Sequence, residues 1–274
     1  MAERMAPILA RAERRMIAFD GGRVASYFWR ARSGEVRGRV ALVHGWTGRA
    51  LVLTAFVEPL LERGLDVVAL DLPGHGDSDG RRLTLPLGAR ALQAVAQAHG
   101  GITGAIAHSF GGPVAVLAAE GGPPLDTAMP LERLVLMASP NSMATVARRF
   151  SDRIGLGNGA RGALEREILR VAERPASALV VGDFLARIGK PALVIHDRGD
   201  HDVPFIRAEE IVKAARGVAH LLATSGVGHR RIVVAPQAIK AAAAFLSDGT
   251  LPVGAAAGTV PGAQSIGADR SPRG

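Results

Sequence analysis

The stretch Ala107-His108-Ser109-Phe110-Gly111 lies between an apolar run at 104–107 and a helix-like stretch at 112–120. A serine at a tight turn from a buried strand into a helix adopts a strained backbone conformation, which projects its hydroxyl above the sheet. Only small side chains fit two positions before and two positions after it. Ala107 and Gly111 meet that requirement, although Ala107 is one methyl group larger than glycine. The stretch predicts a nucleophilic serine, but such patterns are common in Ala- and Gly-rich chains, so the surrounding sequence must decide.

Around this stretch the chain alternates between short apolar runs and helix-like segments. The run Val40-Ala41-Leu42-Val43 is continuously apolar, as in a parallel strand that is buried on both faces. The alternation predicts an α/β fold with a mostly parallel sheet and helices on both faces. We expect eight strands, at 16–19, 24–29, 40–43, 66–70, 102–107, 134–138, 192–195 and 220–223.

Two segments depart from the alternation. Between the sixth and seventh expected strands lie some fifty helix-like, arginine-bearing residues where one crossover helix would suffice. The prediction is a core made of 1–139 and 190–246, with 140–189 inserted as a small helical cap; a longer crossover of irregular helices is the alternative. Residues 247–274 are rich in Gly, Pro, Ala and Ser without an apolar period, which predicts a disordered tail.

Composition excludes several classes of function. The net charge of +8 and the pI near 11.1 come almost entirely from arginines scattered along the chain, and aromatic residues make up only 4%. A nucleic-acid-binding surface would need a clustered basic stripe and stacking aromatics, so no nucleic-acid partner is expected. The chain has no cysteine and no apolar run long enough for a membrane span. Because the N-terminus also lacks the apolar core of a signal peptide, we expect a cytoplasmic protein.

A serine nucleophile needs a base and an acid that orients the base. The candidate base is His229 in Gly226-Val227-Gly228-His229, directly after the last expected strand. The acid lies in the cluster after the strand at 192–195, where Asp197, Asp200 and Asp202 compete. That cluster could also be a His/Asp metal site, but the chain offers no other ligands at a recognisable spacing, so no metal and no cofactor are expected.

Together, these motifs resemble those of the α/β-hydrolase superfamily over roughly 40–246. The stretch His196-Asp197-Arg198-Gly199-Asp200 is similar to the family pattern H-G-x-x-D-x-x-V-P, which selects Asp200 as the acid; Asp197 stands where the pattern has glycine. The segment 71–78 resembles the signature D-x-P-G-x-G-x-S, a turn beside the site. The resemblance implies the α/β-hydrolase fold of small bacterial members with a short cap.

The same resemblance implies the remaining parts of the site. The oxyanion hole would use the backbone amides of Phe110 and Trp46, the latter in the loop His44-Gly45-Trp46. The substrate pocket would be lined by His44, Gly45, Trp46 and Phe110. The catalytic residues would be Ser109, Asp200 and His229.

The expected function is hydrolysis of small-molecule carboxylic esters with small to medium acyl chains, through an acyl-enzyme. The same three residues could instead support acyl transfer to an alcohol, perhydrolysis or carbon–carbon bond hydrolysis, because pocket shape decides which acceptor reacts. A non-catalytic, ligand-binding protein of the same fold is a further alternative.

Overall fold

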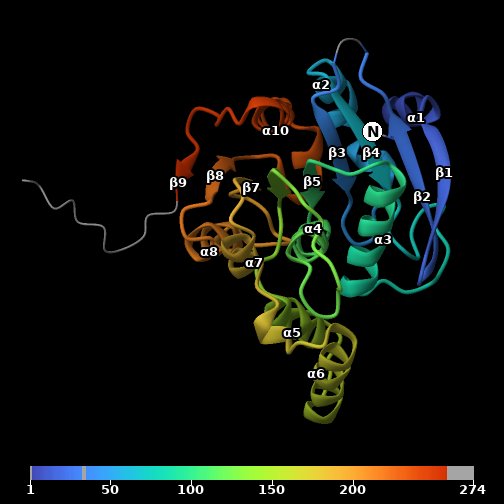
Figure 1. Cartoon of the computed structure of the whole chain (residues 1–274). Helices are drawn as coiled ribbons and strands as arrows, with labels where there is room; N and C mark the ends of the chain where they lie inside the picture. The colour runs from blue at the N-terminus through green and yellow to red at the C-terminus, as the bar shows by residue number, and fades with distance from the viewer. Residues whose placement is uncertain (1, 33–34, 258–274) are drawn as a thin grey trace, which may run out of the picture.

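The computed structural model describes residues 2–32 and 35–257, and within them one nine-stranded sheet forms the centre of the molecule (Figure 1). The strands follow the order β1-β2-β4-β3-β5-β6-β7-β8-β9. Neighbours from β4 to β8 pair in parallel, whereas β1, β2 and β9 pair antiparallel. Their bounds are β1 Glu13–Phe19, β2 Gly22–Trp29, β3 Gly38–Val43, β4 Leu65–Leu70, β5 Gly104–His108, β6 Arg133–Met137, β7 Ala192–Asp197, β8 Ala219–Thr224 and β9 Ala256–Ala257.

All eight expected strands form, and the ninth corrects the prediction. The short strand β9 pairs with His220 and Leu221 of β8 and lies within the range expected to be a disordered tail. It consists of two exposed alanines, which are too few to form a strand pattern, so the prediction could not include it. Residues 247 and 248 of the predicted tail belong to the helix α10 Pro236–Asp248, and residues 258–274 lie outside the described residues.

Helices cover both faces of the sheet, as the alternation of strands and helices predicts. Along β3, Ala41 and Val43 join one apolar core, while Val40 and Leu42 join the other, because successive side chains of a strand point to opposite faces. The first core is closed by α3 Leu85–Ala98, α4 Gly111–Glu120, α7 Val181–Ile188 and α8 Ile206–Ala214. The second is closed by the 3-10 helices η1 Ala50–Phe56 and η3 Ile232–Val234 with α2 Val57–Leu61 and α10 Pro236–Asp248, and α1 Ala2–Ala10 packs on η1.

The segment between β6 and β7 contains two helices that stand away from the sheet (Figure 1). They are α5 Met143–Arg153 and α6 Asn158–Ala172, followed by η2 Ala176–Ala178, and a bridge between Ser142 and Val180 joins the two ends of this segment. Along α5 and α6 only Ser151 and Ala172 are buried. The next helix, α7, packs instead against α4 and α8.

Parallel pairing brings four strand ends to one edge of the sheet. The carboxyl ends of β3, β5 and β7 lead directly into the loops that carry Trp46, Ser109 and Asp200, and the loop after β8 leads into the one-turn helix α9 Gly228–Arg231, which carries His229. Loops at the carboxyl edge of a parallel sheet are the usual place for a binding site. The fold therefore gathers residues that are up to 183 positions apart in the chain, from Trp46 to His229.

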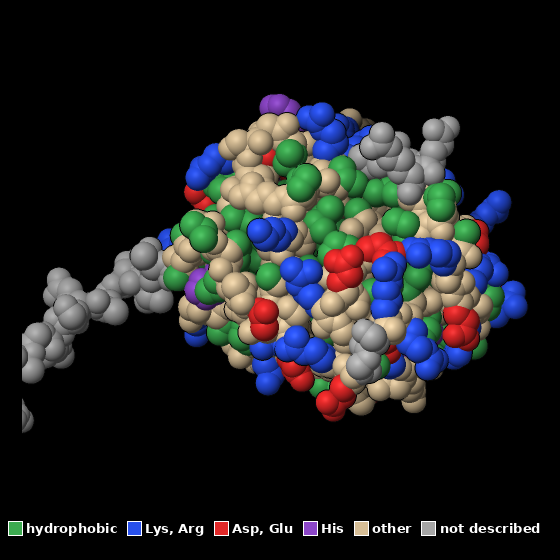
Figure 2. All heavy atoms as spheres, turned by 90° about the horizontal axis from the view of Figure 1, so that it is seen from above, with side chains coloured by type: hydrophobic (Ala, Val, Ile, Leu, Met, Phe, Trp, Pro, Cys, Tyr) green, Lys and Arg blue, Asp and Glu red, His purple; other side chains and the backbone are tan. Residues whose placement is uncertain are grey.

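Charge is dispersed on the face of the molecule seen in Figure 2. Figure 2 shows the face turned away from α5 and α6, where Lys and Arg side chains alternate with acidic and apolar ones. No continuous basic stripe crosses this face, which agrees with the scattering of arginines along the sequence.

Candidate active site

Ser109 occupies a strained turn between β5 and α4. Its φ is +52°, which a residue with a side chain adopts only where the surroundings impose it. The Ser109 amide donates to the Met137 carbonyl at 2.8 Å, which anchors the turn to β6. A Cβ on Gly111 would lie 2.3 Å from the Val43 carbonyl oxygen, so the α4 end of the turn passes against the backbone of β3. This close approach explains why the position after Phe110 must be glycine.

Ser109, His229 and Asp200 form one chain of hydrogen bonds. The Nε2 of His229 lies 3.0 Å from Ser109 Oγ, and its Nδ1 lies 2.8 Å from Asp200 Oδ2. A carboxylate can only accept, so Nδ1 carries the proton and Nε2 is left to accept from the serine hydroxyl. The side chain of Asp200 is fully buried and that of His229 is 13% exposed. The arrangement can transfer the serine proton to the imidazole.

The structure distinguishes Asp200 from the two competing carboxylates. Asp200 Oδ1 accepts from the amides of Asp202 and Val203 at 2.9 and 2.8 Å, which leaves Oδ2 to face His229. Burial favours a higher pKa for Asp200, but hydrogen bonds from His196, His229 and Val203 outweigh it and hold the pKa well below its ordinary value. The group is therefore ionised at neutral pH.

The two competitors lie elsewhere. Asp202 has a side chain that is 52% exposed, and its carboxylate lies 4.0 Å from Arg230. Asp197 is fully buried, and its carboxylate binds Thr224, Gly199 and the amide of Val227.

The two amides predicted to bind an oxyanion are those of Trp46 and Phe110. Among the described residues, the amides of Trp46 and Phe110 donate to no protein oxygen or nitrogen. Gly45 lies against the nucleophile, since a Cβ on it would be 2.8 Å from the Cβ of Ser109. The Trp46 and Phe110 rings contact each other edge to face, with ring centroids 5.2 Å apart, and Trp46 is 58% exposed. Two free amides beside a serine hydroxyl are what a developing oxyanion requires.

His44 does not line an open pocket, which corrects the prediction that it does. It is fully buried; its Nδ1–H donates to the Gly45 carbonyl at 2.7 Å and its Nε2 accepts from the Leu72 amide at 2.9 Å. Burial lowers the pKa of His44 to about 4, so the ring is neutral. His44 thus ties the loop after β3 to the loop after β4.

His108 makes a contact that the sequence did not reveal. Its Nε2 lies 2.9 Å from the backbone carbonyl oxygen of His229, and the two rings are 4.9 Å apart. A carbonyl accepts, so His108 donates through Nε2–H. Burial lowers the pKa of His108 to about 4. The only sequence signal would have been its position beside the nucleophile, which suggests packing and not a polar contact.

The segment 71–78 builds a turn that supports the loop after β3. Buried Asp71 accepts from the Ala50 amide at 2.7 Å and from the Asp77 amide at 2.9 Å. Ser78 donates to the Asp71 carbonyl at 2.6 Å, and His75 accepts from the Thr47 amide at 3.2 Å. These residues contact backbone, which agrees with the structural role expected for the signature.

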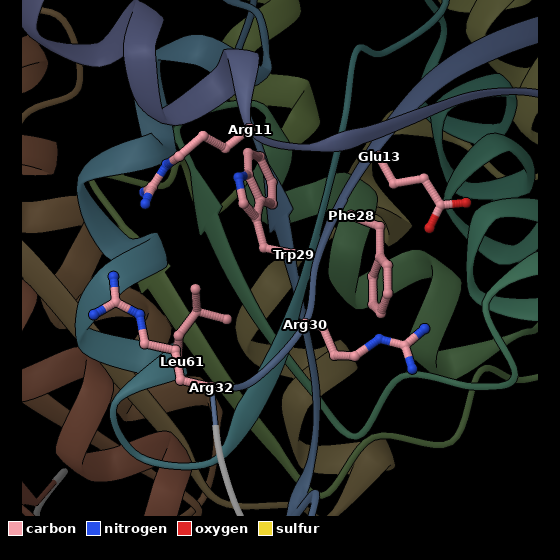
Figure 3. A pocket seen from close by; sticks show the side chains of 7 residues that line it. All are labelled: Arg11, Glu13, Phe28, Trp29, Arg30, Arg32 and Leu61. Carbon is pink, nitrogen blue, oxygen red and sulfur yellow. The ribbon is translucent and has the colours of Figure 1, made fainter.

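Two cavities lie away from Ser109. One of about 320 Å³ lies between β1, β2 and α2, where Arg30 stands over Phe28 (Figure 3). Arg11 and Arg32, which line it, both bind Glu58. A second cavity, of about 820 Å³, lies near Arg39 and Met129, at the amino ends of β3, β5 and β6. Neither includes Ser109, Asp200 or His229.

Two absences concern the described residues alone. Within 2–32 and 35–257, no cluster of three His, Asp or Glu side chains could hold a metal ion. In the same part of the chain, no helix has both the length and the apolar character needed to cross a bilayer.

Solved structures share this architecture at low sequence identity. Est1E from Butyrivibrio proteoclasticus, solved with ferulic acid bound, is 22% identical, with a TM-score of 0.67 over 85% of this chain and 98% of its own. The Pyrococcus furiosus esterase PF2001 is 19% identical, with a TM-score of 0.64 over 90% and 92%. A bromoperoxidase from Bacillus anthracis is 16% identical, with a TM-score of 0.61 over 85% and 99%. At these identities the likeness shows the fold.

Sequence comparison assigns the family. A search of curated proteins finds no match to this chain. The sequence model of the "Alpha/beta hydrolase family" matches residues 40–242, well over half of the chain, and this range includes Ser109, Asp200 and His229. On this match, together with the strand order and the strained turn at Ser109, the chain belongs to the alpha/beta hydrolase family.

Proposed function

We propose that this protein is a serine hydrolase of carboxylic esters, with Ser109 as nucleophile, His229 as general base and Asp200 as the group that orients the base. The observation that carries the proposal is the continuous hydrogen-bonded chain from Ser109 Oγ through His229 to Asp200, with steps of 3.0 and 2.8 Å. The esterases among the structural neighbours are consistent with this chemistry. No step requires a metal or cofactor.

The reaction would run in two halves. His229 Nε2 takes the proton of Ser109 as Oγ attacks the ester carbonyl carbon, and the amides of Trp46 and Phe110 bind the oxyanion. His229 then gives that proton to the departing alcohol, which leaves an acyl-enzyme. A water activated by the same imidazole hydrolyses the acyl-enzyme and restores Ser109. Asp200 remains ionised throughout and stabilises the imidazolium.

Substrate size is the second part of the proposal. We assign α5 and α6, within the segment predicted as 140–189, to a short cap over the site, and a short cap suits small to medium acyl chains. Trp46 and Phe110 would line the acyl side, because their rings touch each other next to the free amides.

The test is hydrolysis of p-nitrophenyl esters from acetate to laurate by the wild type and by Ser109→Ala. Turnover that disappears in Ser109→Ala supports a serine esterase, and the chain-length profile sizes the acyl pocket. Added alcohol or hydrogen peroxide should not divert the acyl group if water is the preferred acceptor. Equal rates in the two proteins, or no turnover in either, would contradict the esterase proposal and favour a ligand-binding protein.

A further inference from the structure

Asp197 stands where the family pattern has glycine, and it is a fully buried carboxylate at the end of β7. An isolated buried charge is costly, so the groups around it must compensate. Its Oδ1 accepts from the Gly199 amide at 2.9 Å, and its Oδ2 accepts from Thr224 Oγ1 at 2.9 Å and from the Val227 amide at 3.1 Å. The carboxylate thus binds three donors, and all come from the ends of β7 and β8.

These donors are the backbone of the two loops that carry the acid and the base. Gly199 immediately precedes Asp200, and Val227 lies two residues before His229. Asp197 and Thr224 face each other in the parallel register of β7 and β8, and the Arg198 amide donates to the Thr224 carbonyl at 2.8 Å. One carboxylate therefore spans both loops at the point where they leave the sheet.

A glycine at 197 would supply no acceptor to these donors. Burial favours a higher pKa for Asp197, but hydrogen bonds from Val227, Thr224 and Gly199 lower it below the ordinary value. The carboxylate is thus ionised at neutral pH, when it can accept from every donor at once. The departure from the family pattern coincides with a hydrogen-bonded link that the pattern itself does not provide.

We propose that Asp197 is a positioning residue, which holds the His229 loop at the distance from Asp200 that aligns the imidazole on Ser109. It acts through the backbone of Val227 and Gly199 and touches no reacting atom. The inference rests on the proposed function, because it assigns Asp197 to the alignment of a base. It adds a fourth residue to the site, beyond Ser109, His229 and Asp200.

The variant that tests this is Asp197→Asn. An amide offers one oxygen in place of two, so whichever way it turns, an NH₂ group faces at least one of the present donors. We expect kcat for p-nitrophenyl acetate to fall about 10- to 100-fold while KM changes less than about twofold, since misplacement affects the reaction more than ground-state binding. The downfield proton resonance of His229 Nδ1–H should broaden or disappear.

Asp66→Asn is the matched control. Asp66 is a buried carboxylate near the start of β4, at the opposite edge of the sheet, and accepts from the Ala31 amide at 2.9 Å and from Arg39 at 3.0 Å. Its loss should lower the melting temperature but leave kcat and the His229 resonance unchanged. If Asp197→Asn does not fold, Thr224→Val replaces it as the test, because this variant removes only one of the three donors to Asp197. We expect kcat of Thr224→Val to fall about threefold.

Two outcomes separate the inference from the proposed function. If the wild type shows no Ser109-dependent turnover, the proposed function fails, yet the His229 resonance still shows whether Asp197 holds the imidazole against Asp200. If turnover is present, but kcat and the resonance are unchanged in both Asp197→Asn and Thr224→Val while the melting temperature falls, Asp197 is only a stabilising residue and the inference is wrong.

Discussion

Ser109 and His229 meet at one point, but the protein holds their loops in different ways. The Ser109 turn, whose amide also bonds the Met137 carbonyl, is held by close backbone contact: Gly111 leaves no room for a Cβ against the Val43 carbonyl, and Ser109 keeps a φ of +52°. The His229 loop is fixed by polar bonds, from Asp197 to the Val227 amide at 3.1 Å and from His108 to the His229 carbonyl at 2.9 Å. Changes of volume should therefore disturb the first loop, and changes of charge or protonation the second.

The largest effect should come from removing the base itself. His229→Ala leaves Ser109 without a proton acceptor and should lower kcat/KM on the order of 10⁴- to 10⁶-fold. Asp200→Asn should cost less, because the imidazole remains present although wrongly oriented. Steady-state kinetics on p-nitrophenyl acetate measures both, and circular dichroism should show an unchanged fold. A loss in Asp200→Asn that exceeds the loss in His229→Ala would contradict the assigned roles.

Gly111→Ala tests whether close backbone contact holds the Ser109 turn, because it adds a methyl group there. In Gly111→Ala the new Cβ would lie 2.3 Å from the Val43 carbonyl oxygen and 2.7 Å from the His44 carbonyl oxygen, both backbone atoms. We expect a loss of about 3 kcal/mol or more in the free energy of unfolding, with activity lost at every pH, because backbone must move.

The control for Gly111→Ala is Gly159→Ala. Gly159 lies in α6, where a Cβ meets nothing within 4 Å. Alanine there should raise the free energy of unfolding by up to about 1 kcal/mol, from helix propensity. Urea unfolding compares the two, and equal effects would show that the contact with β3 is unimportant.

Acid should lower the stability of the protein by protonating the buried histidines that form hydrogen bonds around the site. Burial lowers the pKa of His44 and of His108 to about 4, whereas an unfolded histidine titrates near 6.5. Between these values the unfolded chain binds more protons, so stability is complete above about pH 6.5 and falls as the pH drops to 4. The loss is on the order of 3 kcal/mol for each histidine. Below about pH 3.8 the carboxylates of Asp200 and Asp197, whose pKa values are depressed, add to the loss.

His108→Gln isolates one of these histidines. Glutamine keeps an N–H donor for the His229 carbonyl but does not titrate, so the free energy of unfolding should depend less on pH between 6.5 and 4. Urea unfolding at pH 7, 5 and 4 measures the slope for both proteins. Equal slopes would mean that His108 is not held neutral in the folded state.

The smallest effect should come from α5, which takes part in neither loop. Phe150 is 53% exposed, so Phe150→Ser should change the free energy of unfolding by less than about 0.5 kcal/mol. Turnover of p-nitrophenyl acetate should stay the same. A cap over the acyl pocket predicts an altered KM for longer acyl chains, and an unchanged chain-length profile would argue against that part of the proposal.

The sequence predicted what depends on local pattern. Every expected strand forms. Strands β3 to β7 are apolar runs buried along most of their length, which leaves them few alternatives, whereas the exposed or half-buried β1 extends the expected 16–19 back to Glu13. The resemblance of 196–204 to the family pattern H-G-x-x-D-x-x-V-P selected Asp200 among three carboxylates, and the structure places it 2.8 Å from His229. Strand β9 escaped prediction, because two exposed alanines carry no period.

What escaped prediction at the site are bonds between a side chain and distant backbone. His108 donates to a carbonyl 121 residues away, and Asp197 accepts from an amide 30 residues away. No spacing rule connects such positions, because a backbone carbonyl or amide exists at every residue. His44 was misplaced for a related reason: a histidine beside an expected pocket and a histidine buried beneath it have the same sequence neighbours.

The chain has two tryptophans, and they occupy opposite environments. Trp29 is 5% exposed and its indole N–H donates to the Ile8 carbonyl, whereas Trp46 is 58% exposed beside Phe110. Soluble quenchers such as acrylamide will therefore reach Trp46 and spare Trp29. The quenchable part of the intrinsic fluorescence therefore comes from Trp46, whose ring contacts Phe110, so a ligand that covers these two rings should reduce acrylamide quenching.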